Sequence, residues 1–256
     1  MNTFGIAMVN VVPDALLTDS SQDLAVTDLV RQLHSLAHEP DPQFSAVNLS
    51  DFPAYHKKLI HKIGKELKAM NCEYLGSFEP LGLTEILKQR IAVGLFITED
   101  RCCAISVATL KPKRPGWRSF LPALIKGDMQ KISIIEISSW FSNGRFINTL
   151  QTSATINIEY GGLIHIKGMA AHTSVKQQLQ QHGQLNAKFL EKFSTAHHML
   201  MHSVADVEQA SRYEAKAKNE YRRSIDYVTD KELRKLLRTF YDRLSSKVRK
   251  QLEQYQ

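Results

Sequence analysis

The sequence predicts an α+β protein in which a central antiparallel sheet, arranged as a meander, packs against helices and is followed by a long C-terminal helical hairpin. Between residues 91 and 166, short apolar segments alternate with turn signals, the sharpest being Ser142-Asn143-Gly144. Asn-Gly accepts the positive φ angles that a tight hairpin requires. From Thr173 onward, apolar residues instead recur every three or four positions, which is typical of amphipathic helices.

The expected strands are rich in β-branched and aromatic residues, which suit a pleated and half-buried surface. Turns are expected at residues 98–101, 143–144 and 161–162. They help to separate six strands at residues 91–97, 102–110, 131–141, 145–150, 155–160 and 163–166. The stretch 71–83, which precedes them, fits either a strand or a loop.

Helices are also expected ahead of the sheet. The first follows Ser20, which has Asp23 three positions on in the manner of a capping box, and it ends before the two prolines of residues 38–43. A second helix covers residues 51–70 with a basic exposed surface, and a short helical turn covers 84–90. The basic surface of the second helix consists of Lys57, Lys58, His61, Lys62, Lys65 and Lys68.

The C-terminal part has helix signals of its own. Ser174 with Gln177 and Thr229 with Glu232 each form the pattern of a capping box, and no proline lies between the two. Helices of this length must bury their apolar stripes against each other, against the sheet or against a second chain. We expect a helical hairpin here, and a homodimer through these helices is one possible arrangement.

The chain has 256 residues, of which 43% are apolar, and this is enough to bury a core. We expect an N-terminal helical segment with a linker (1–45), an α+β sheet domain (46–172) and a basic helical region (173–256). The formal net charge is +7, and residues 211–256 alone contain 13 cations and 7 anions. Such an excess favours association with an acidic protein, a nucleic acid or an anionic lipid surface.

Cysteine usage and hydropathy bear on location. Cys72, Cys102 and Cys103 are an odd set, and the adjacent pair would point to opposite faces of a strand, so they cannot form a disulfide framework. The N-terminal apolar run has no basic residue ahead of it and stops at Pro13, unlike a signal peptide, and no later run approaches the roughly 20 apolar residues of a membrane span. We therefore expect a cytoplasmic protein without a transmembrane segment.

The proline-rich loop after residue 110 is the best local candidate for a binding site. It interleaves cations with Trp117 and has no acidic residue between Lys111 and Lys126. Cations beside aromatic side chains suit a phosphate backbone with stacked bases, or an anionic membrane interface. Together with cations of the last helices, the candidate anion- or partner-binding residues are Lys111, Lys113, Arg114, Trp117, Arg118, Lys126, Arg222, Arg223, Arg234, Lys235 and Arg238.

No motif in the sequence specifies a reaction, because it contains neither a Gly-x-Ser-x-Gly nucleophile elbow nor a glycine-rich phosphate loop. Glu136 interrupts an apolar strand, and His165 stands between two isoleucines. An enzyme with its site on the sheet, using Arg118 or Lys126 to grip an anion, is therefore an alternative function. No catalytic residue is assigned on this basis.

Two histidine pairs have the four-residue spacing that can bridge a zinc ion on a helix: His198 with His202, and His34 with His38. Met199 stands where a hydrolytic zinc motif requires glutamate. Neither pair has further ligands close by in the sequence, so neither a metal nor another cofactor is expected.

Four segments resemble an uncharacterised group of bacterial proteins: ELKAMNCEYLGSFEP, VGLFITEDRCCAISVA, IIEISSWFSNGRFINTLQT and HTSVKQQLQQH. In that group, a helix and a Gly-Phe pair lead into a β-meander with a Ser-Asp-Gly hairpin and a threonine-rich strand. Here Asn71-Cys72 replaces Gly-Phe and Asn143 replaces Asp, and the similarity covers roughly residues 65–190. The resemblance implies an α+β fold without an assigned reaction, next to membrane spans in some members, and it supplies no catalytic residue.

The leading hypothesis is a non-enzymatic interaction or regulatory protein that uses a basic surface to contact an acidic partner. The alternatives are the enzyme with its site on the sheet and a nucleic-acid-binding protein. Nucleic-acid binding predicts an affinity that falls steeply with salt, because phosphate contacts release counterions.

Overall fold

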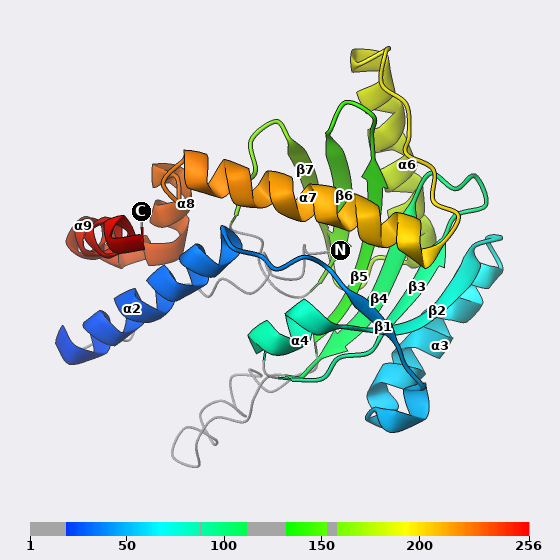
Figure 1. Cartoon of the computed structure of the whole chain (residues 1–256), viewed down its shortest axis with the longest axis horizontal. Coiled ribbons are helices and arrows are strands. Elements are labelled where there is room, and N and C mark those ends of the chain that lie inside the picture. Colours follow the sequence, from blue (N-terminus) through cyan, green and yellow to red (C-terminus); the bar gives the residue numbers. More distant parts are fainter. Residues whose placement is uncertain (1–18, 88, 112–131, 153–157, 256) are drawn as a thin grey trace.

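Figure 1 shows the computed structural model of the chain, which describes residues 19–87, 89–111, 132–152 and 158–255. The fold is α+β, as the sequence predicts. One sheet contains β1 (Phe44–Ala46), β2 (Glu73–Pro80), β3 (Val93–Ile97), β4 (Ala104–Leu110), β5 (Ile132–Trp140), β6 (Phe146–Gln151) and β7 (Ile164–Met169). The described α-helices are α2 (Asp19–Leu36), α3 (Ala54–Lys68), α4 (Leu81–Leu87), α6 (Val175–Lys192), α7 (Val204–Ser224), α8 (Asp230–Leu237) and α9 (Tyr241–Leu252).

The strands lie in the sheet in their chain order, and every neighbouring pair except the last is antiparallel. The expected tight turn joins β5 to β6. There Gly144 has a φ of +74° and donates its N–H to the carbonyl of Phe141 at 3.0 Å. Residues 71–83, for which the sequence allows either a strand or a loop, contain β2. This strand also pairs with the short β1. A meander therefore accounts for the first six strands.

The last strand, β7, departs from this meander because it runs parallel to β6. The sequence predicts a hairpin around Gly161 and Gly162, with strands on both sides. In the described residues Tyr160 forms only an isolated bridge with Ile164, and residues 153–157 of the expected strand lie outside them. The chain thus crosses over after β6 before it adds the edge strand.

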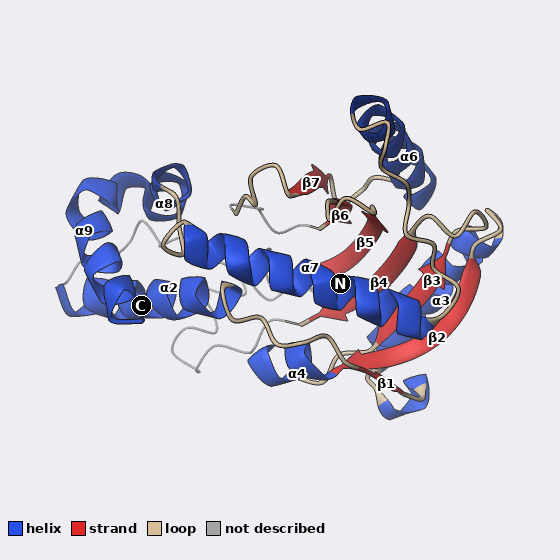
Figure 2. Cartoon of the chain, turned by 45° about the horizontal axis from the view of Figure 1, so that its top comes forward, coloured by secondary structure: helices blue, strands red, loops and turns tan. Residues whose placement is uncertain are grey.

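Alternate residues of the strands face two separate cores, one on each side of the sheet. Figure 2 shows α7 crossing in front of the sheet and α3 behind it. Phe96 and Ile137 point to the side covered by α3 and α6, whereas Leu95 and Ile134 point to the side crossed by α7. Both faces of β3 and β4 are buried. This explains why both strands are mostly apolar, whereas a strand with one face in solvent alternates apolar and polar residues.

The C-terminal helical region is confirmed, but its last helices pack against the N-terminal helix beside the sheet (Figure 1). Leu33 of α2 shares a core with Leu244 and Val248 of α9. At the surface, Lys247 of α9 lies 3.0 Å from Asp23 of α2. The first and last described helices of the chain therefore stabilise each other.

The expected long helix after Ser174 is interrupted, since residues 193–203 between α6 and α7 are not helical. Their backbone pairs with the end of β5 and the turn after it. Ser142 donates its N–H to the carbonyl of His197 at 2.9 Å, and Met199 donates to Trp140 at 2.8 Å. Pairing with a distant strand replaces the hydrogen bonds that a helix would have supplied.

The last expected helix is also divided, into α8 and α9. Arg238 lies between them with a φ of +49°, outside the range of a right-handed helix. The capping boxes predicted at Ser174 with Gln177 and at Thr229 with Glu232 are present, whereas Ser20, predicted to precede the first helix, already lies inside α2. Local capping signals therefore locate the starts of α6 and α8, whereas the helix ends follow from tertiary structure.

A buried ion pair anchors α7 across the sheet. Glu214 and Lys218 are both fully buried, with 2.7 Å between Oε1 and Nζ. Glu214 also accepts hydrogen bonds from Trp140 Nε1 of β5 at 3.0 Å and from Asn148 Nδ2 of β6 at 2.8 Å. Burial is the largest influence on the pKa of Glu214 and raises it, but the charge of Lys218 and the hydrogen bonds from Lys218 and Asn148 act together to lower the pKa below its ordinary value. The pair therefore stays charged inside the protein.

Glu39, between α2 and β1, adds a second buried carboxylate beside this pair. Its backbone N–H and carbonyl both bind the side-chain amide of Asn219 on α7, at 3.0 and 2.9 Å. Among the described residues its carboxylate has no hydrogen-bond partner. Burial raises the pKa of Glu39 to about 7; Lys218 opposes this shift and Glu214 adds to it. The carboxyl therefore keeps its proton up to nearly neutral pH.

Replacing Lys218 with Met should lower the free energy of unfolding by about 3–5 kcal/mol, because Glu214 then stays buried without its cation. The matched control is Lys216, an exposed lysine of the same helix whose Nζ lies 4.0 Å from Glu220. Lys216→Met should change the stability by less than about 1 kcal/mol. Urea denaturation at neutral pH measures both variants, and equal losses would contradict an anchoring role for the buried pair.

The free energy of unfolding should also fall as the pH rises toward about 7. The folded state binds the Glu39 proton more tightly than the unfolded state does, and the stability that this difference provides is lost as the carboxyl ionises. The ordinary pKa of this carboxyl is 4.5, so the contribution is fully present below that value and is lost through about 7. The total loss is about 3 kcal/mol. Glu39→Gln is neutral at every pH and should lack this component, whereas the exposed Glu66→Gln should keep it. Urea denaturation curves across this pH range measure the free energy of unfolding of each variant. If it depends on pH in the same way for Glu39→Gln and the unmodified protein, Glu39 is not the group responsible.

Candidate functional site

Of the candidate residues in the proline-rich loop, the structure describes Lys111 alone. It follows directly after β4 and is half-buried. The others lie outside the described residues: Lys113, Arg114, Trp117, Arg118 and Lys126. Their part in binding stays a prediction.

Carboxylates of the same chain pair with most cations of the C-terminal helices. Lys235 lies 2.9 Å from Glu159, and Arg234 lies 3.2 Å from Asp230. At least nine of the 13 cations in residues 211–256 form such ion pairs, namely Arg212, Lys216, Lys218, Arg222, Lys231, Arg234, Lys235, Lys247 and Arg249. Most of the cations at this end of the chain therefore already have a carboxylate partner within the protein.

Arg222 differs from the other C-terminal candidates because it is fully buried. Its guanidinium lies 2.7 Å from Glu232 and 4.5 Å from the centre of the Tyr160 ring. A partner cannot reach this side chain in the folded protein, so Arg222 belongs to the core and not to a binding surface. Arg223 and Arg238, by contrast, are exposed.

A continuous group of exposed cations lies on α3. It consists of five lysines and one histidine, and Glu66 is the acidic residue of this helix. In the part of the chain that the structure describes, none of the six lies within 4.0 Å of a carboxylate. We call this group the basic face of α3: Lys57, Lys58, His61, Lys62, Lys65 and Lys68.

The local sequence explains how α3 presents this face. His56, Ile60, Ile63 and Leu67 are buried and recur at steps of three and four residues, so they determine which side of the helix meets the sheet. Gly94 of β3 permits the close approach, since a Cβ at this position would lie only 2.7 Å from Ile60 Cγ2. The lysines therefore project from a helix that lies tightly against a rigid sheet.

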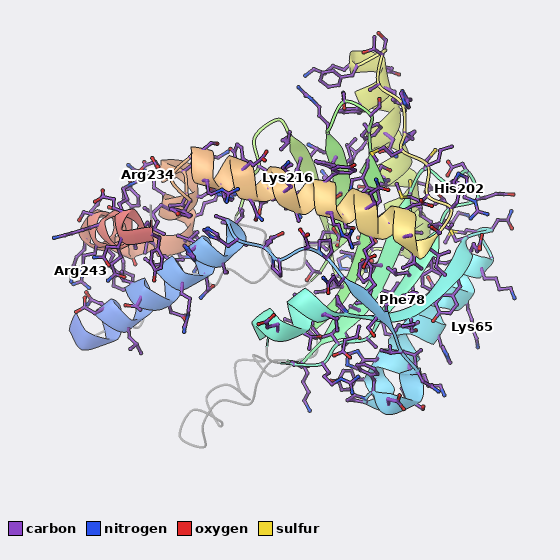
Figure 3. The ribbon with its side chains drawn as sticks, viewed as in Figure 1. Lys65, Phe78, His202, Lys216, Arg234 and Arg243 are labelled. Carbon is purple, nitrogen blue, oxygen red and sulfur yellow. The ribbon has the colours of Figure 1, made fainter. Side chains whose placement is uncertain are left out.

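The basic face of α3 and the C-terminal helices lie at opposite ends of the molecule. Figure 3 labels Lys65 of α3 toward one end of the longest axis, and Arg234 and Arg243 toward the other. The two groups of cations do not merge into a single surface. A partner that binds one of them does not need to contact the other.

A depression of about 580 Å³ borders the basic face of α3, between this helix and strands β1 and β2. Lys57 and His61 contribute to its lining from α3, and Tyr74 and Ser77 contribute from β2. The Tyr74 hydroxyl lies 2.6 Å from Ser77 Oγ, and its ring packs on Phe96 with 4.8 Å between the ring centres. Tyr74 nevertheless stays 48% exposed. The depression thus combines cations, hydroxyl groups and an exposed aromatic ring.

The structure does not bring together the two residues of the alternative catalytic site. Glu136 is buried on β5, whereas His165 is exposed on β7. The register places Glu136 beside Leu150, and Leu150 beside Gly168, so these three positions share one face of the sheet. His165 is three residues from Gly168 and therefore faces the other side. The two side chains are not placed to act on one substrate.

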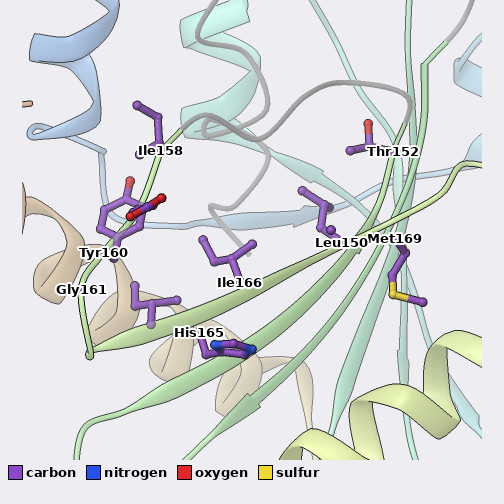
Figure 4. A pocket seen from close by; sticks show the side chains of 11 residues that line it. Leu150, Thr152, Ile158, Tyr160, Gly161, His165, Ile166 and Met169 are labelled. Atoms are coloured by element: carbon purple, nitrogen blue, oxygen red, sulfur yellow. The ribbon is translucent and has the colours of Figure 1, made fainter. Parts of the chain in front are cut away.

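His165 instead borders a cavity of about 490 Å³ beside β7 (Figure 4). Apolar side chains such as Ile158 and Met169 form much of its lining. Glu159 is the acidic residue of this lining, and its carboxylate already binds Lys235. The described lining therefore mixes apolar side chains with His165 and Glu159, and the Glu159 carboxylate is already paired with a lysine.

Sequence reasoning missed a buried polar cluster between α6 and the sheet. Nε2 of His182 lies 2.9 Å from Ser139 Oγ, and its Nδ1 lies 3.2 Å from Thr149 Oγ1. Asn186 Nδ2 donates a hydrogen bond to Ser139 Oγ at 2.9 Å, and Cys103 Sγ lies 3.2 Å from the same oxygen. The cluster places thiol, hydroxyl, imidazole and amide groups together, which invites comparison with a catalytic site.

Its electrostatics indicate a structural role. Burial lowers the pKa of His182 to about 3 and raises the pKa of Cys103 to about 12, so both groups are neutral at physiological pH. A buried neutral thiol is a poor nucleophile. The signal in the sequence is the four-residue spacing of Gln178, His182 and Asn186, which places a polar row on the buried side of α6.

Neither histidine pair is joined by a third potential metal ligand among the described residues. His198 and His202 lie in the non-helical segment before α7, so the helical spacing expected for them is wrong, while the rings of His34 and His38 stack with 4.1 Å between their centres. Within the described residues, no group of three or more potential metal ligands comes together. Each described helix is too short or too polar to cross a bilayer.

Comparisons with models of protein families, with curated proteins and with solved structures found no match for this chain. The resemblance to bacterial proteins without an assigned reaction therefore stays a prediction.

Proposed function

We propose that the protein is a non-enzymatic interaction or regulatory module that binds an acidic partner through the basic face of α3. The observation that carries the proposal is a set of five exposed lysines on one helix, none of which has a carboxylate partner among the described residues. Like charges held close together repel each other, and an anionic partner relieves this repulsion.

The lysines are close enough to act together. From Lys57 to Lys68, the face extends along α3 for about 16 Å. Successive turns lie about 5.4 Å apart, which is shorter than the Debye length of about 8 Å at physiological salt. A partner that carries several anionic groups can therefore contact several lysines at once, and its affinity should fall as the salt concentration rises.

The triple substitution Lys58→Glu, Lys62→Glu and Lys65→Glu should weaken binding to an anionic probe by at least about 100-fold, because three favourable contacts become repulsive. The probes are poly-glutamate, an oligonucleotide and vesicles that contain phosphatidylserine. Fluorescence anisotropy measures the soluble probes at low salt, and co-sedimentation measures the vesicles.

The matched control makes the same change of charge at the other end of the molecule, with Arg223→Glu, Arg243→Glu and Lys250→Glu. All three residues are exposed, and this variant should bind within a few-fold of the unmodified protein. Loss of binding in the control alone would place recognition on the C-terminal helices. Absence of binding to every probe by the unmodified protein would refute the proposed function.

A further inference from the structure

We propose that the partner of the basic face of α3 is a single-stranded nucleic acid, whose phosphates follow the lysines and whose base stacks on Tyr74 in the neighbouring depression. This inference rests on the proposed function and names the class of its partner. It depends on the placement of one aromatic ring beside the cations, a feature that binding to anions in general does not require.

Tyr74 is a preformed stacking platform. Its ring packs against Phe96, which is buried, and its hydroxyl is held at 2.6 Å from Ser77 Oγ. Almost half of the side chain nevertheless remains exposed, although large apolar and aromatic side chains are usually covered. A ring held in this way loses little conformational freedom when a base stacks on it, which favours affinity.

The cations lie where the backbone of a stacked base would pass. Lys57 and His61 line the same depression as Tyr74, one helical turn apart. Lys58, Lys62 and Lys65 continue the positive surface along α3. All three border a shallow groove on this helix. An aromatic platform next to a cationic track is the arrangement by which proteins bind single strands without reading their sequence.

The composition of the face disfavours a lipid surface. Helices that lie on membranes insert an apolar side between the headgroups. The apolar residues Ile60, Ile63 and Leu67 of α3 are instead buried against the sheet, so the exposed side has no apolar stripe to insert.

The exposed ring of Tyr74 disfavours an acidic polypeptide. Lysine acts as a point charge that attracts carboxylates and phosphates alike, so the cations leave both partners open and the distinction rests on Tyr74. The helix α3 contains five lysines and no arginine. The exposed ring of Tyr74, by contrast, has no role in binding carboxylates. A duplex is disfavoured as well, because its bases are already stacked and paired.

The first test measures binding of the full chain to a fluorescein-labelled oligothymidine and to a strand of the same length that carries phosphates and sugars but no bases. The strand without bases should bind about 5- to 100-fold more weakly, because it cannot stack on Tyr74. The logarithm of affinity should fall with the logarithm of salt concentration with a slope near −3.5, since five lysines on a single strand contribute about −0.7 each. Equal binding of the two strands would overturn the stacking inference.

The second test substitutes the ring. Tyr74→Leu keeps an apolar side chain on Phe96 and should lose affinity for oligothymidine about 5- to 100-fold, without losing affinity for the strand that lacks bases. Tyr74→Phe keeps the ring and should bind within about two-fold of the unmodified protein. Circular dichroism checks that both variants are folded. Equal affinity of the Leu variant and the unmodified protein would overturn the inference.

The probes also separate the inference from the proposed function. Binding to poly-glutamate or to phosphatidylserine vesicles without binding to oligothymidine would overturn the nucleic-acid partner and leave the proposed function standing. Binding to none of the anionic probes would refute both.

Discussion

The burial of both faces of the sheet is the constraint on which the rest of the structure depends. The central strands present apolar side chains in both directions, so helices must cover each face. Every covering helix commits one side to this contact. Its outward side is then free to carry charge, and α3 shows the result, with its apolar stripe against β3 and its lysines in solvent.

The two faces hold their covering helices by different polar contacts. On one face, His182 and Ser139 form a neutral hydrogen-bonded cluster beneath α6. On the other, Glu214 and Lys218 form a charged pair beneath α7, with Trp140 and Asn148 as further donors. Directional contacts of this kind distinguish one placement of a helix from another, which apolar packing alone does poorly. The rigid base that results is what lets the exposed side of α3 keep a defined arrangement of cations.

The parts of the fold that follow from the sequence are those with local causes. The turn at Gly144 and the capping boxes at Ser174 and Thr229 each involve only a few consecutive residues. The parallel pairing of β7 and the break after α6 have distant causes, such as the hydrogen bond from Met199 to Trp140. No local pattern encodes these contacts, so the sequence predicts a meander and a longer helix there.

The same distinction applies to the candidate site. The outward position of the lysines on α3 follows from the periodicity of its apolar residues, which is a local property. Whether a cation stays unpaired depends on residues far away in the sequence, as the ion pair of Lys247 with Asp23 shows. A count of charges along the sequence therefore overestimates how many cations of the C-terminal helices are available to a partner. Tyr74 lies in a stretch that fits a strand or a loop, and its position next to Lys57 emerges only when β2 is placed beside α3.

The contact between α2 and α9 also affects how the chain reaches this state in the cell. On a ribosome, α2 emerges about 200 residues before α9 is complete, a delay of roughly 10–40 s. During this interval Leu33 and its apolar neighbours on α2 lack their final cover. A nascent chain that stalls before α9 therefore displays an uncovered apolar helix, the kind of surface to which chaperones and quality-control proteases respond.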